Sequence, residues 1–348
     1  MRLGLGVPLL EAALRPRAVE IRAAATGHLL AEAPLAGAAE ERYGAPYCVL
    51  ARPALHRLLT GAANRAGALI RYASEVEGFG LEREGVVVHI AGTAPIAAAG
   101  LVGADGLWSR ARAGLGQGVR PVHSGRIAWR ATVSAGDVPR SFDGAAVVTA
   151  WLAPRAHGVT YAIDAEGTIN VVVVTEGRIA SEGWDVDADS GELVGLAANC
   201  APALRDLMGA GGHWRAWPLF ETRPPMSFGT GAMALVGDAA HPMLPFAAQG
   251  AAMAIEDAWV LAEAAGSRPT DLSAAFRAYE RTRAGRVGRV GAMARRNGRA
   301  FHLGWPLALI RNRALAARSG AGLLARLDWL YGGGPVARAE AAAHSGAT

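Results

Sequence analysis

Polar side chains gather directly after an apolar stretch near residue 235. In MALVGDAAHPMLPFAAQG, Gly237 and Asp238 follow a short apolar segment, and Gln249 and Gly250 begin a segment with helical spacing. A carboxylate at a strand end can accept two hydrogen bonds from a ribose or ribityl diol, and a preceding glycine lets the ligand approach closely. The positive end of the following helix favours an anionic or electron-rich ligand atom. These residue types predict a site for a ligand that carries such a diol.

A second cluster of the same kind follows the apolar residues 98–104. The stretch GLVGADGLWSRAR has Asp105 and Gly106 at the end of this segment, and Ser109 and Arg112 in the residues that follow. The glycine allows close approach of a ligand, while the carboxylate, hydroxyl and guanidinium supply polar contacts at fixed positions. The same residues also fit an ordinary strand–turn–helix in which Asp105 caps the helix, so both interpretations stay open.

The elements expected around these clusters define a fold class. Apolar strands precede the clusters, over residues 98–104 and 232–236, and a helix follows the later one over residues 247–265. Strands follow one another from about residue 126 to 175 without an intervening helix, which predicts an antiparallel sheet. We therefore predict one discontinuous α/β domain that carries an inserted β-sheet domain. Ligands bind such folds beyond the carboxyl ends of the parallel strands.

The remaining expected elements are short. A turn at residues 25–27 predicts a hairpin of residues 19–22 and 28–33. Two further helices are expected, one over residues 53–65 that begins at Pro53 and one from a Ser190 cap through Met208. Four more strands are expected, over residues 48–51, 71–77, 80–83 and 86–90.

Composition narrows the chemistry. The chain has 348 residues, a formal net charge of +5 and a pI near 9.7, and it contains no lysine. A Walker-type phosphate lysine, a pyridoxal Schiff base and a lysine general base are thereby excluded. Cys48 and Cys200 lie far apart without metal-ligand spacing, so we expect no metal and a reducing, cytoplasmic compartment. We see no secretory signal and no apolar stretch long enough for a bilayer, and expect a soluble protein without a membrane partner.

Arginines are concentrated between residues 277 and 299. Such a charge run invites a nucleic-acid interpretation, but aromatic stacking residues are sparse there and no binding motif accompanies the charge. We therefore expect no nucleic-acid partner, and instead a solvated helix face or pairing with acidic residues such as Glu280. The arginines are Arg277, Arg281, Arg283, Arg286, Arg289, Arg295, Arg296 and Arg299.

The chain opens with MRLGLGVPLL, in which Gly4 and Gly6 look like the start of a dinucleotide-binding loop. That loop requires a hydrophobic strand before it, a third glycine and a following helix. No strand precedes Gly4, Leu9 occupies the third glycine position, and Pro8 lies where helix N–H groups should face a pyrophosphate. We therefore expect a helix start at residues 7–14 instead.

Four stretches together resemble the single-component FAD-dependent aromatic hydroxylases, the salicylate hydroxylase-like group of flavoprotein monooxygenases. DGLWSRAR is similar to that family's D-G-x-x-S-x-x-R motif, which touches the FAD pyrophosphate, and GDAAHPMLPFAAQGAAMAIEDA is similar to its second FAD motif. GRIAWRATV is similar to its A-W-R-G segment, with Ala131 in place of the usual glycine. Arg52, after CVLA, matches an arginine that contacts FAD.

This resemblance implies a fold and a set of cofactor residues. The expected fold is the α/β FAD-binding fold of glutathione reductase and p-hydroxybenzoate hydroxylase with an inserted antiparallel β-sheet substrate domain. Residues 1–115 and 225–290 are expected to form the FAD-binding domain, residues 116–224 the substrate domain, and residues 291–348 a C-terminal helical segment and tail. The expected FAD-binding residues are Arg52, Asp105, Gly106, Ser109, Arg112, Gly237, Asp238, Pro245, Gln249 and Gly250.

The family's reaction uses FAD, NAD(P)H and O₂ to hydroxylate a small aromatic acid or phenol. His157 and Tyr161 in HGVTY are evenly spaced, so both side chains face the same side of the expected sheet. They resemble the substrate-side histidine and tyrosine of hydroxybenzoate-type members, and an imidazole poised near neutral pH suits removal of a phenolic proton. Gln249 is a further catalytic candidate. A sheet histidine satisfied by a neighbour is an equal alternative for His157.

Members of this family begin with a βαβ unit that carries G-x-G-x-x-G, and this sequence resembles the segment that follows that unit. We therefore expect an N-terminally truncated fold without the adenosine-binding module, and a weakened affinity for FAD. Two other functions stay open: a non-catalytic protein with weak or no FAD binding, and a flavin-dependent NAD(P)H oxidase or dehydrogenase. The oligomeric state is not predicted.

Overall fold

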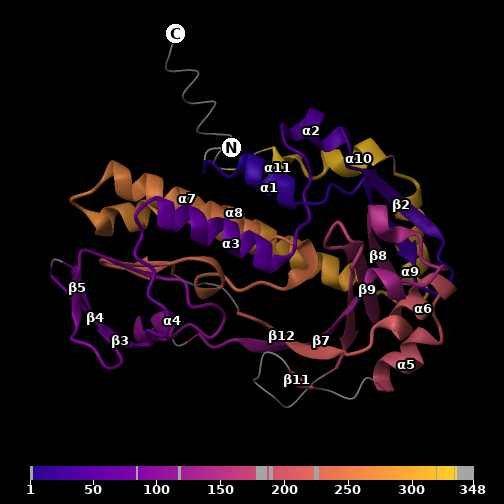
Figure 1. The fold of residues 1–348 in the computed structure, drawn as a ribbon, viewed down its shortest axis with the longest axis horizontal. Helices are drawn as coiled ribbons and strands as arrows, with labels where there is room; N and C mark the ends of the chain where they lie inside the picture. Colours follow the sequence, from indigo (N-terminus) through magenta and orange to yellow (C-terminus); the bar gives the residue numbers. More distant parts are fainter. Residues whose placement is uncertain are drawn as a thin grey trace, which may run out of the picture. The chain divides into compact units, whose positions relative to one another are not determined.

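The computed structural model describes residues 3–83, 85–116, 119–177, 186–187, 191–222, 227–318, 320–332 and 334. The chain divides into two compact units, and most of their elements are labelled in Figure 1. The first, called the sheet unit below, consists of Met1–Ile70, Gly125–Pro218 and Arg299–Gly332. The second, called the helix unit below, consists of Arg71–Ser124, Leu219–Gly298 and Gly333–Thr348.

One large sheet dominates the sheet unit. Its strands are β1 (Ala18–Ala23), β2 (Leu29–Pro34), β7 (Val122–Val133), β8 (Val147–Ala153), β9 (Ala156–Ala162), β10 (Ile169–Glu176), β11 (Val186–Asp187) and β12 (Arg215–Glu221). The eight strands lie in the order β11-β12-β7-β10-β9-β8-β1-β2. β7, β10, β9 and β8 pair antiparallel, which confirms the sheet predicted for the middle of the chain.

The N-terminal hairpin is also confirmed, and it extends this sheet. β1 and β2 pair antiparallel, and β1 pairs in parallel with β8, so that Ala18 lies opposite Val147. This pairing groups the N-terminal residues with the β-rich block, whereas the sequence placed them with residues 225–290. The division into a cofactor domain and a substrate domain stays a prediction, because compactness does not test what each segment binds.

The hydrophobic core of the sheet unit lies between one face of this sheet and two helices. α5 (Gly191–Ala197) and α6 (Pro202–Ala210) supply buried leucines, and β10 supplies Val171 and Val173 from alternate positions. Alternate residues of a strand point to the same face, so one face of β10 joins the core. Trp151 is buried in this core, and its indole N–H donates to Thr160 Oγ1 at 3.0 Å.

The single helix expected to end at Met208 is wrong, because Pro202 cannot continue a helix and instead starts α6 in its first turn. The expected cap Ser190 lies outside the described residues. A strand over residues 48–51 is also wrong, since the only pairing there is an isolated bridge between Leu14 and Val49 within the described chain.

Six further helices belong to the sheet unit: α1 (Gly6–Ala12), α2 (Ala38–Tyr43), α3 (Arg52–Arg65), α9 (Leu307–Ala316), α10 (Gly320–Ala325) and α11 (Asp328–Tyr331). Helices that are distant in sequence contact each other in this set. The guanidinium of Arg42 donates to the carboxylate of Asp328 through two bonds of 2.6 Å, and the hydroxyl of Tyr43 donates to Leu324 O at 2.7 Å. α2 is therefore fixed to the C-terminal helices by directed polar contacts.

The helix unit contains two small sheets. One consists of β3 (Val76–Glu82), β4 (Gly85–Ile90) and β5 (Ile96–Ala98), and the other of β13 (Gly229–Thr230), β14 (Met233–Leu235) and β6 (Leu101–Gly103). The two strands expected before residue 84 are one strand, β3. The strand expected over residues 98–104 is divided between β5 and β6 of different sheets, and the intervening Gly100 lies where a Cβ would be 2.9 Å from the side chain of Leu272.

Two long helices, α7 (Gly250–Ser267) and α8 (Leu272–Phe301), run side by side in the helix unit (Figure 1). α7 begins later than expected because Pro245–Ala247 forms a 3₁₀ turn and Ala248 adopts a left-handed conformation with φ of 51°. The unit also contains the short helix α4 (Arg110–Gly114) and a 3₁₀ turn at Gly237–Ala239. Within the described residues, no helix has both the length and the apolar composition required to cross a membrane.

Candidate cofactor and substrate sites

The two predicted polar clusters follow the ends of two adjacent strands in the same sheet of the helix unit. β6 and β14 are parallel neighbours, with Leu101 opposite Met233 and Gly103 opposite Leu235. The pairing continues past the strands, because Val236 N donates to Gly103 O at 3.0 Å. Asp105 and Asp238 therefore follow the carboxyl ends of adjacent parallel strands, which is where open α/β sheets bind their ligands.

The later strand ends in a tight turn that requires glycine. Gly237 has a φ of 58°, and a Cβ at this position would lie 3.1 Å from the Cβ of Ala254 on α7. A side chain there is disfavoured both by the left-handed backbone and by the neighbouring helix. The turn leaves the next residue, Asp238, exposed at the strand end. A carboxylate at a strand end can accept hydrogen bonds from a diol.

In the earlier cluster, polar side chains cap a helix. Asp105 Oδ1 accepts from Ser109 Oγ at 2.5 Å and Oδ2 accepts from Ala111 N at 3.0 Å, while Ser109 Oγ accepts from Arg112 N at 2.9 Å. These bonds satisfy N–H groups at the start of α4, as the capping interpretation of Asp105 predicts. Gly106 supplies the positive φ of 78° between strand and cap. Capping therefore fixes the orientation of a carboxylate whose residue remains exposed.

Arg112 ties the two clusters together. Its side chain is buried, and its guanidinium donates to Ala239 O at 2.8 Å, to Leu107 O at 2.5 Å and to Asp238 O at 3.4 Å. Burial lowers the pKa of Arg112, and the charge of Asp105 acts in the opposite direction. The pyrophosphate contact that the resemblance implies for this motif stays a prediction, and the observed bonds are to main-chain carbonyls that follow both strands. Arg112 thus fixes the spacing of the two ends.

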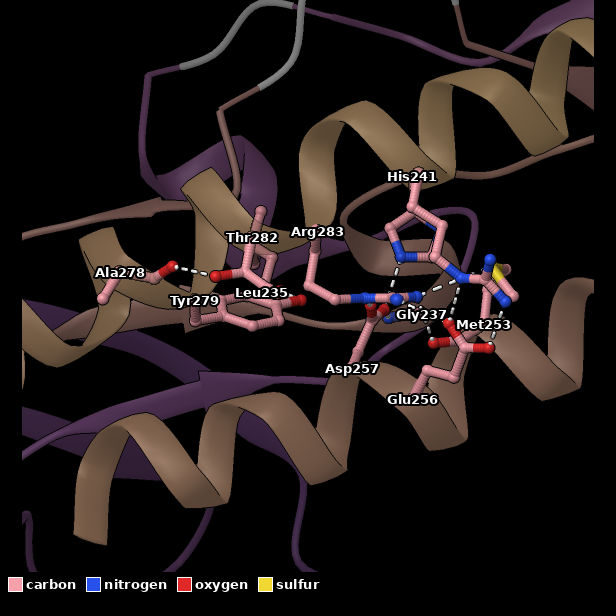
Figure 2. Close-up of polar contacts among 11 residues, drawn as sticks. Leu235, Gly237, His241, Met253, Glu256, Asp257, Ala278, Tyr279, Thr282 and Arg283 are labelled. Carbon is pink, nitrogen blue, oxygen red and sulfur yellow. Dashed lines mark hydrogen bonds and ion pairs between the residues drawn. The ribbon is translucent and has the colours of Figure 1, made fainter. Parts of the chain in front are cut away.

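A buried ionic network supports the Gly237 turn from behind (Figure 2). Asp257 on α7 accepts hydrogen bonds from Gly237 N at 3.0 Å and from His241 Nε2. Arg283 on α8 donates to Asp257 Oδ1 at 2.7 Å and to Glu256 Oε2 at 2.5 Å. Burial raises the pKa of Asp257, but the bonds and charges of His241, Arg283 and Gly237 N outweigh it and lower the pKa below its usual value. The carboxylate is therefore ionised.

The same network confirms, for two arginines of α8, the expected pairing with acidic residues, and it corrects only which acidic residues are the partners. Arg283 is fully buried rather than part of a solvated face, and its acidic partners come from α7 rather than from Glu280. Arg286 also pairs with Glu256, at 2.7 Å. The acidic pair of residues 256–257 was visible in the quoted motif, but their pairing with Arg283 depends on how α7 packs on α8.

Tyr279, one turn before Arg283 on α8, holds the strand itself. Its hydroxyl donates to Leu235 O, the last residue of β14, at 2.9 Å (Figure 2). Burial is the main cause of the raised pKa of Tyr279, so the hydroxyl keeps its proton and remains a donor. Strand end and turn are thus each fixed by a separate side chain of α7 or α8.

The loop before α7 is held in a similar way. Asn297 Nδ2 donates to Phe246 O at 3.0 Å, and Gly298 lies where a Cβ would be 2.5 Å from the ring of Phe246. Pro245 is exposed, and the buried Gln249 makes no side-chain cap to the 18-residue helix that begins at Gly250. The first N–H groups of such a helix favour an electron-rich ligand atom.

These features fit FAD. Asp238, which is exposed after a glycine of positive φ, suits a diol, and among the described residues no side chain caps the helix start at Gly250 by a hydrogen bond. Both lie in the helix unit, as do Asp105, Gly106, Ser109 and Arg112. Arg52, the other expected cofactor residue, begins α3 in the sheet unit and is exposed.

The substrate candidates His157 and Tyr161 both lie on β9 in the sheet unit, and Gln249 belongs to the helix unit. His157 is buried, and its Nδ1 lies 2.8 Å from Nε2 of His302. Burial, followed by the charges of His302 and Arg126, lowers the pKa of His157 to about 3. The expected near-neutral pKa is therefore wrong, because the sequence does not reveal that this position is buried against a second histidine. Tyr161 is half-buried, and burial raises its pKa.

Comparison with known proteins places the chain in a family. The family described as FAD binding domain matches residues 3–290. The chain is 35% identical over 336 residues to 3-amino-4-hydroxybenzoate 2-monooxygenase PtmB3 of Streptomyces platensis, covering 95% of this chain and 82% of the relative. It is 30% identical over 334 residues to a 3-hydroxybenzoate 6-hydroxylase of Polaromonas naphthalenivorans, covering 95% and 82%.

Solved structures share the fold. A salicylate hydroxylase substrate complex matches with a TM-score of 0.79 at 23% identity and covers 95% of this chain and 84% of its own. Klebsiella pneumoniae HpxO complexed with FAD and uric acid matches with a TM-score of 0.82 at 23% identity, covering 94% and 84%. The matching family model and the sequence relatives show that the chain belongs to the FAD-binding flavoprotein monooxygenases, the family that includes these hydroxybenzoate hydroxylases.

Proposed function

We propose that this protein hydroxylates a small aromatic acid of the hydroxybenzoate class with FAD, NAD(P)H and O₂. The observation that carries the proposal is the parallel register of β6 and β14, which sets Asp105 and Asp238 at adjacent strand ends. The names of the sequence relatives, which act on 3-hydroxybenzoate and 3-amino-4-hydroxybenzoate, support the substrate class.

In this proposal the helix unit holds the cofactor. Asp238 accepts hydrogen bonds from a diol of FAD, and the start of α7, with Gln249 and Gly250, faces an electron-rich atom of the ring system. The spacing of the two strand ends near the pyrophosphate is set by the earlier cluster, Asp105, Gly106, Ser109 and Arg112. The turn after β14 is shaped by Gly237, and the loop before α7 by Pro245. Arg52 stays a candidate on the basis of the resemblance alone. Bound FAD supplies the redox chemistry that links NAD(P)H oxidation to insertion of one oxygen atom.

The substrate candidates Tyr161 and His157 differ in how burial shifts their pKa values. Tyr161 has a raised pKa and keeps its proton at neutral pH, so it can donate a hydrogen bond to a phenolic or carboxylate oxygen. His157, with its pKa lowered to about 3, is a neutral imidazole at neutral pH, which can donate or accept a hydrogen bond but is a weak base for a phenolic proton. We retain Gln249 as a hydrogen-bonding candidate. We also retain a cytoplasmic location, which the free thiols Cys48 and Cys200 favour.

The test is transfer of labelled oxygen. The purified protein with FAD is supplied with NADH or NADPH, ¹⁸O₂ and, in turn, 3-hydroxybenzoate, 4-hydroxybenzoate, salicylate and 3-amino-4-hydroxybenzoate. We expect one of them to gain a single ¹⁸O atom, detected by mass spectrometry, and no product without the nicotinamide. NAD(P)H consumption matched by hydrogen peroxide, with no ring product, supports the oxidase alternative and rejects the hydroxylase. Failure to bind FAD supports the non-catalytic alternative.

A further inference from the structure

Three polar side chains from neighbouring strands lie on one face of the large sheet. In the antiparallel register, Asn170 on β10 is opposite both Thr132 on β7 and Tyr161 on β9, and Val172 is opposite Arg130. Opposite residues share a face, and so do residues two apart on a strand. Arg130, Asn170 and Tyr161 therefore point to the same side of the sheet.

This side is the reverse of the core. Trp129, Ala131, Val171 and Val173, which alternate with the polar residues on β7 and β10, all belong to the hydrophobic core cluster. The polar face is half-buried rather than fully exposed at Arg130, Asn170 and Tyr161. Water competes less for hydrogen-bond donors at such a position than on an open surface.

Among the described residues, two donors on this face have no hydrogen-bond partner. Nε of Arg130 and Nδ2 of Asn170 are buried atoms without a hydrogen bond among the described residues. A buried donor without an acceptor lowers the stability of the fold. Such a group therefore indicates local strain, a bound water or a ligand site. Both atoms are donors, and the missing partner is therefore an acceptor.

The charge of the face defines that acceptor further. Within the described part of the chain no carboxylate pairs with Arg130, whose guanidinium instead lies 4.2 Å from the centre of the Trp217 ring. Burial lowers the pKa of Arg130, Tyr161 raises it, and the nearby positive charge of Arg52 lowers it further. Arg130 remains a cation, and Arg52 adds to the positive potential around it. An anion is the acceptor that this potential favours.

We propose that Arg130 and Asn170 bind the carboxylate of a planar aromatic acid, with Tyr161 on the same face as an additional donor. A carboxylate accepts hydrogen bonds only and has two oxygens in one plane, which matches a guanidinium edge and an amide N–H. The aromatic rings of Tyr161 and Trp217 favour a flat apolar body beside the charge. This inference rests on the proposed function and names the group by which the substrate is selected.

The test compares an acid with its neutral isostere. Binding of 3-hydroxybenzoate and of 3-hydroxybenzamide to the FAD-supplemented protein is measured by isothermal titration calorimetry, which requires no turnover. We expect the unmodified protein to bind the acid about tenfold to hundredfold more tightly than the amide, the range for a charged hydrogen bond. Arg130→Gln removes this preference and leaves amide affinity nearly unchanged. Arg130→Lys restores part of it.

Two further variants keep the test decisive. Arg205→Gln removes the same charge from an exposed position on α6 in the same unit and should retain the full preference. Asn170→Asp keeps the shape of the side chain but offers Arg130 an internal carboxylate, so it should also abolish the preference. This variant serves as the test if Arg130→Gln does not fold. A preference that survives Arg130→Gln or Asn170→Asp in a folded variant overturns the proposal, as does equal binding of acid and amide by the unmodified protein.

These outcomes are separate from those of the proposed function. Selective binding of the acid without formation of an ¹⁸O-labelled product from any ring retains the carboxylate site and rejects the hydroxylase. Hydroxylation of neutral phenols with no preference for the acid retains the hydroxylase and rejects the carboxylate site.

Discussion

The guanidinium of Arg283 on α8 lies 2.7 Å from the carboxylate of Asp257 on α7, and neither side chain is exposed to solvent. The other oxygen of Asp257 accepts the N–H of Gly237, directly before Asp238 (Figure 2). A packing contact between two helices thus determines the conformation of a turn at the candidate cofactor site.

Replacing the acid in this pair should destabilise the protein strongly. In Asp257→Asn, Arg283 loses a charged partner while it stays buried away from water. Breaking a buried ion pair in this way lowers the free energy of unfolding by about 3–5 kcal/mol. Urea unfolding followed by circular dichroism measures the change. Glu263→Gln on the exposed side of α7 is the matched control, expected within about 0.5 kcal/mol of the unmodified protein. Equal stability of the two variants would show that the ion pair contributes nothing.

The turn glycine should be intolerant of a methyl group. Gly237→Ala places a Cβ 3.1 Å from Ala254 in a left-handed backbone, so we expect a loss of about 1–3 kcal/mol and weaker retention of FAD. Thermal unfolding and the ratio of flavin to protein absorbance measure the two effects. Gly266→Ala, in α7 with no atom near the added Cβ, should be neutral or stabilising. A Gly237 variant that behaves like the Gly266 variant contradicts the assigned role.

Arg112 should matter for the spacing of the two strand ends. Arg112→Met removes the donors to Ala239 O and Leu107 O but keeps much of the apolar stem. Each buried carbonyl that loses its donor lowers the stability of the folded protein by up to about 3 kcal/mol. We expect lower stability together with reduced flavin content after gel filtration. Arg110→Met, on the exposed side of the same helix, is the control and should keep the stability and the flavin content of the unmodified protein. Full flavin content in the Arg112 variant would refute the spacing role.

The two buried histidines of the sheet unit predict a pH dependence. Burial is the first cause that lowers the pKa of His157 to about 3 and that of His302 to about 4. An unfolded histidine titrates near pH 6.5, about the ordinary value. Between these values the unfolded chain binds protons that the folded chain does not, so stability is fully present above about pH 6.5 and falls as the pH drops toward about 4.

The slope of this loss is measurable. Each histidine contributes about 1.4 kcal/mol per pH unit within the window, and urea unfolding at pH 7, 6 and 5 gives the sum. His302→Gln removes one of the two groups and should make the slope shallower. His56→Gln, at an exposed position of the same unit, should leave it unchanged. An unchanged slope in the His302 variant would show that this pair does not cause the effect.

The sequence by itself determined the local elements and the residue types of the candidate cofactor site. A period of two in the middle of the chain predicted β7 to β10, and the glycine and aspartate after two apolar segments identified both strand ends. Such signals are local, because they depend on alternation, turn chemistry and the residue that follows a strand. The helix break at Pro202 has a local cause, because proline cannot continue a helix, whereas Gly100, which divides the expected strand, lies where Leu272 of another element packs closely.

Only the tertiary structure decided which of these residues meet. The pairing of β1 with β8, the tie from Arg112 to Ala239 and the ion pair of Asp257 with Arg283 join segments that are distant in sequence. Burial likewise depends on what covers a residue, and it changed His157 from a near-neutral base into a neutral imidazole beside His302. Charge partners and solvent exposure arise from the packing of the whole unit, and no local pattern encodes them.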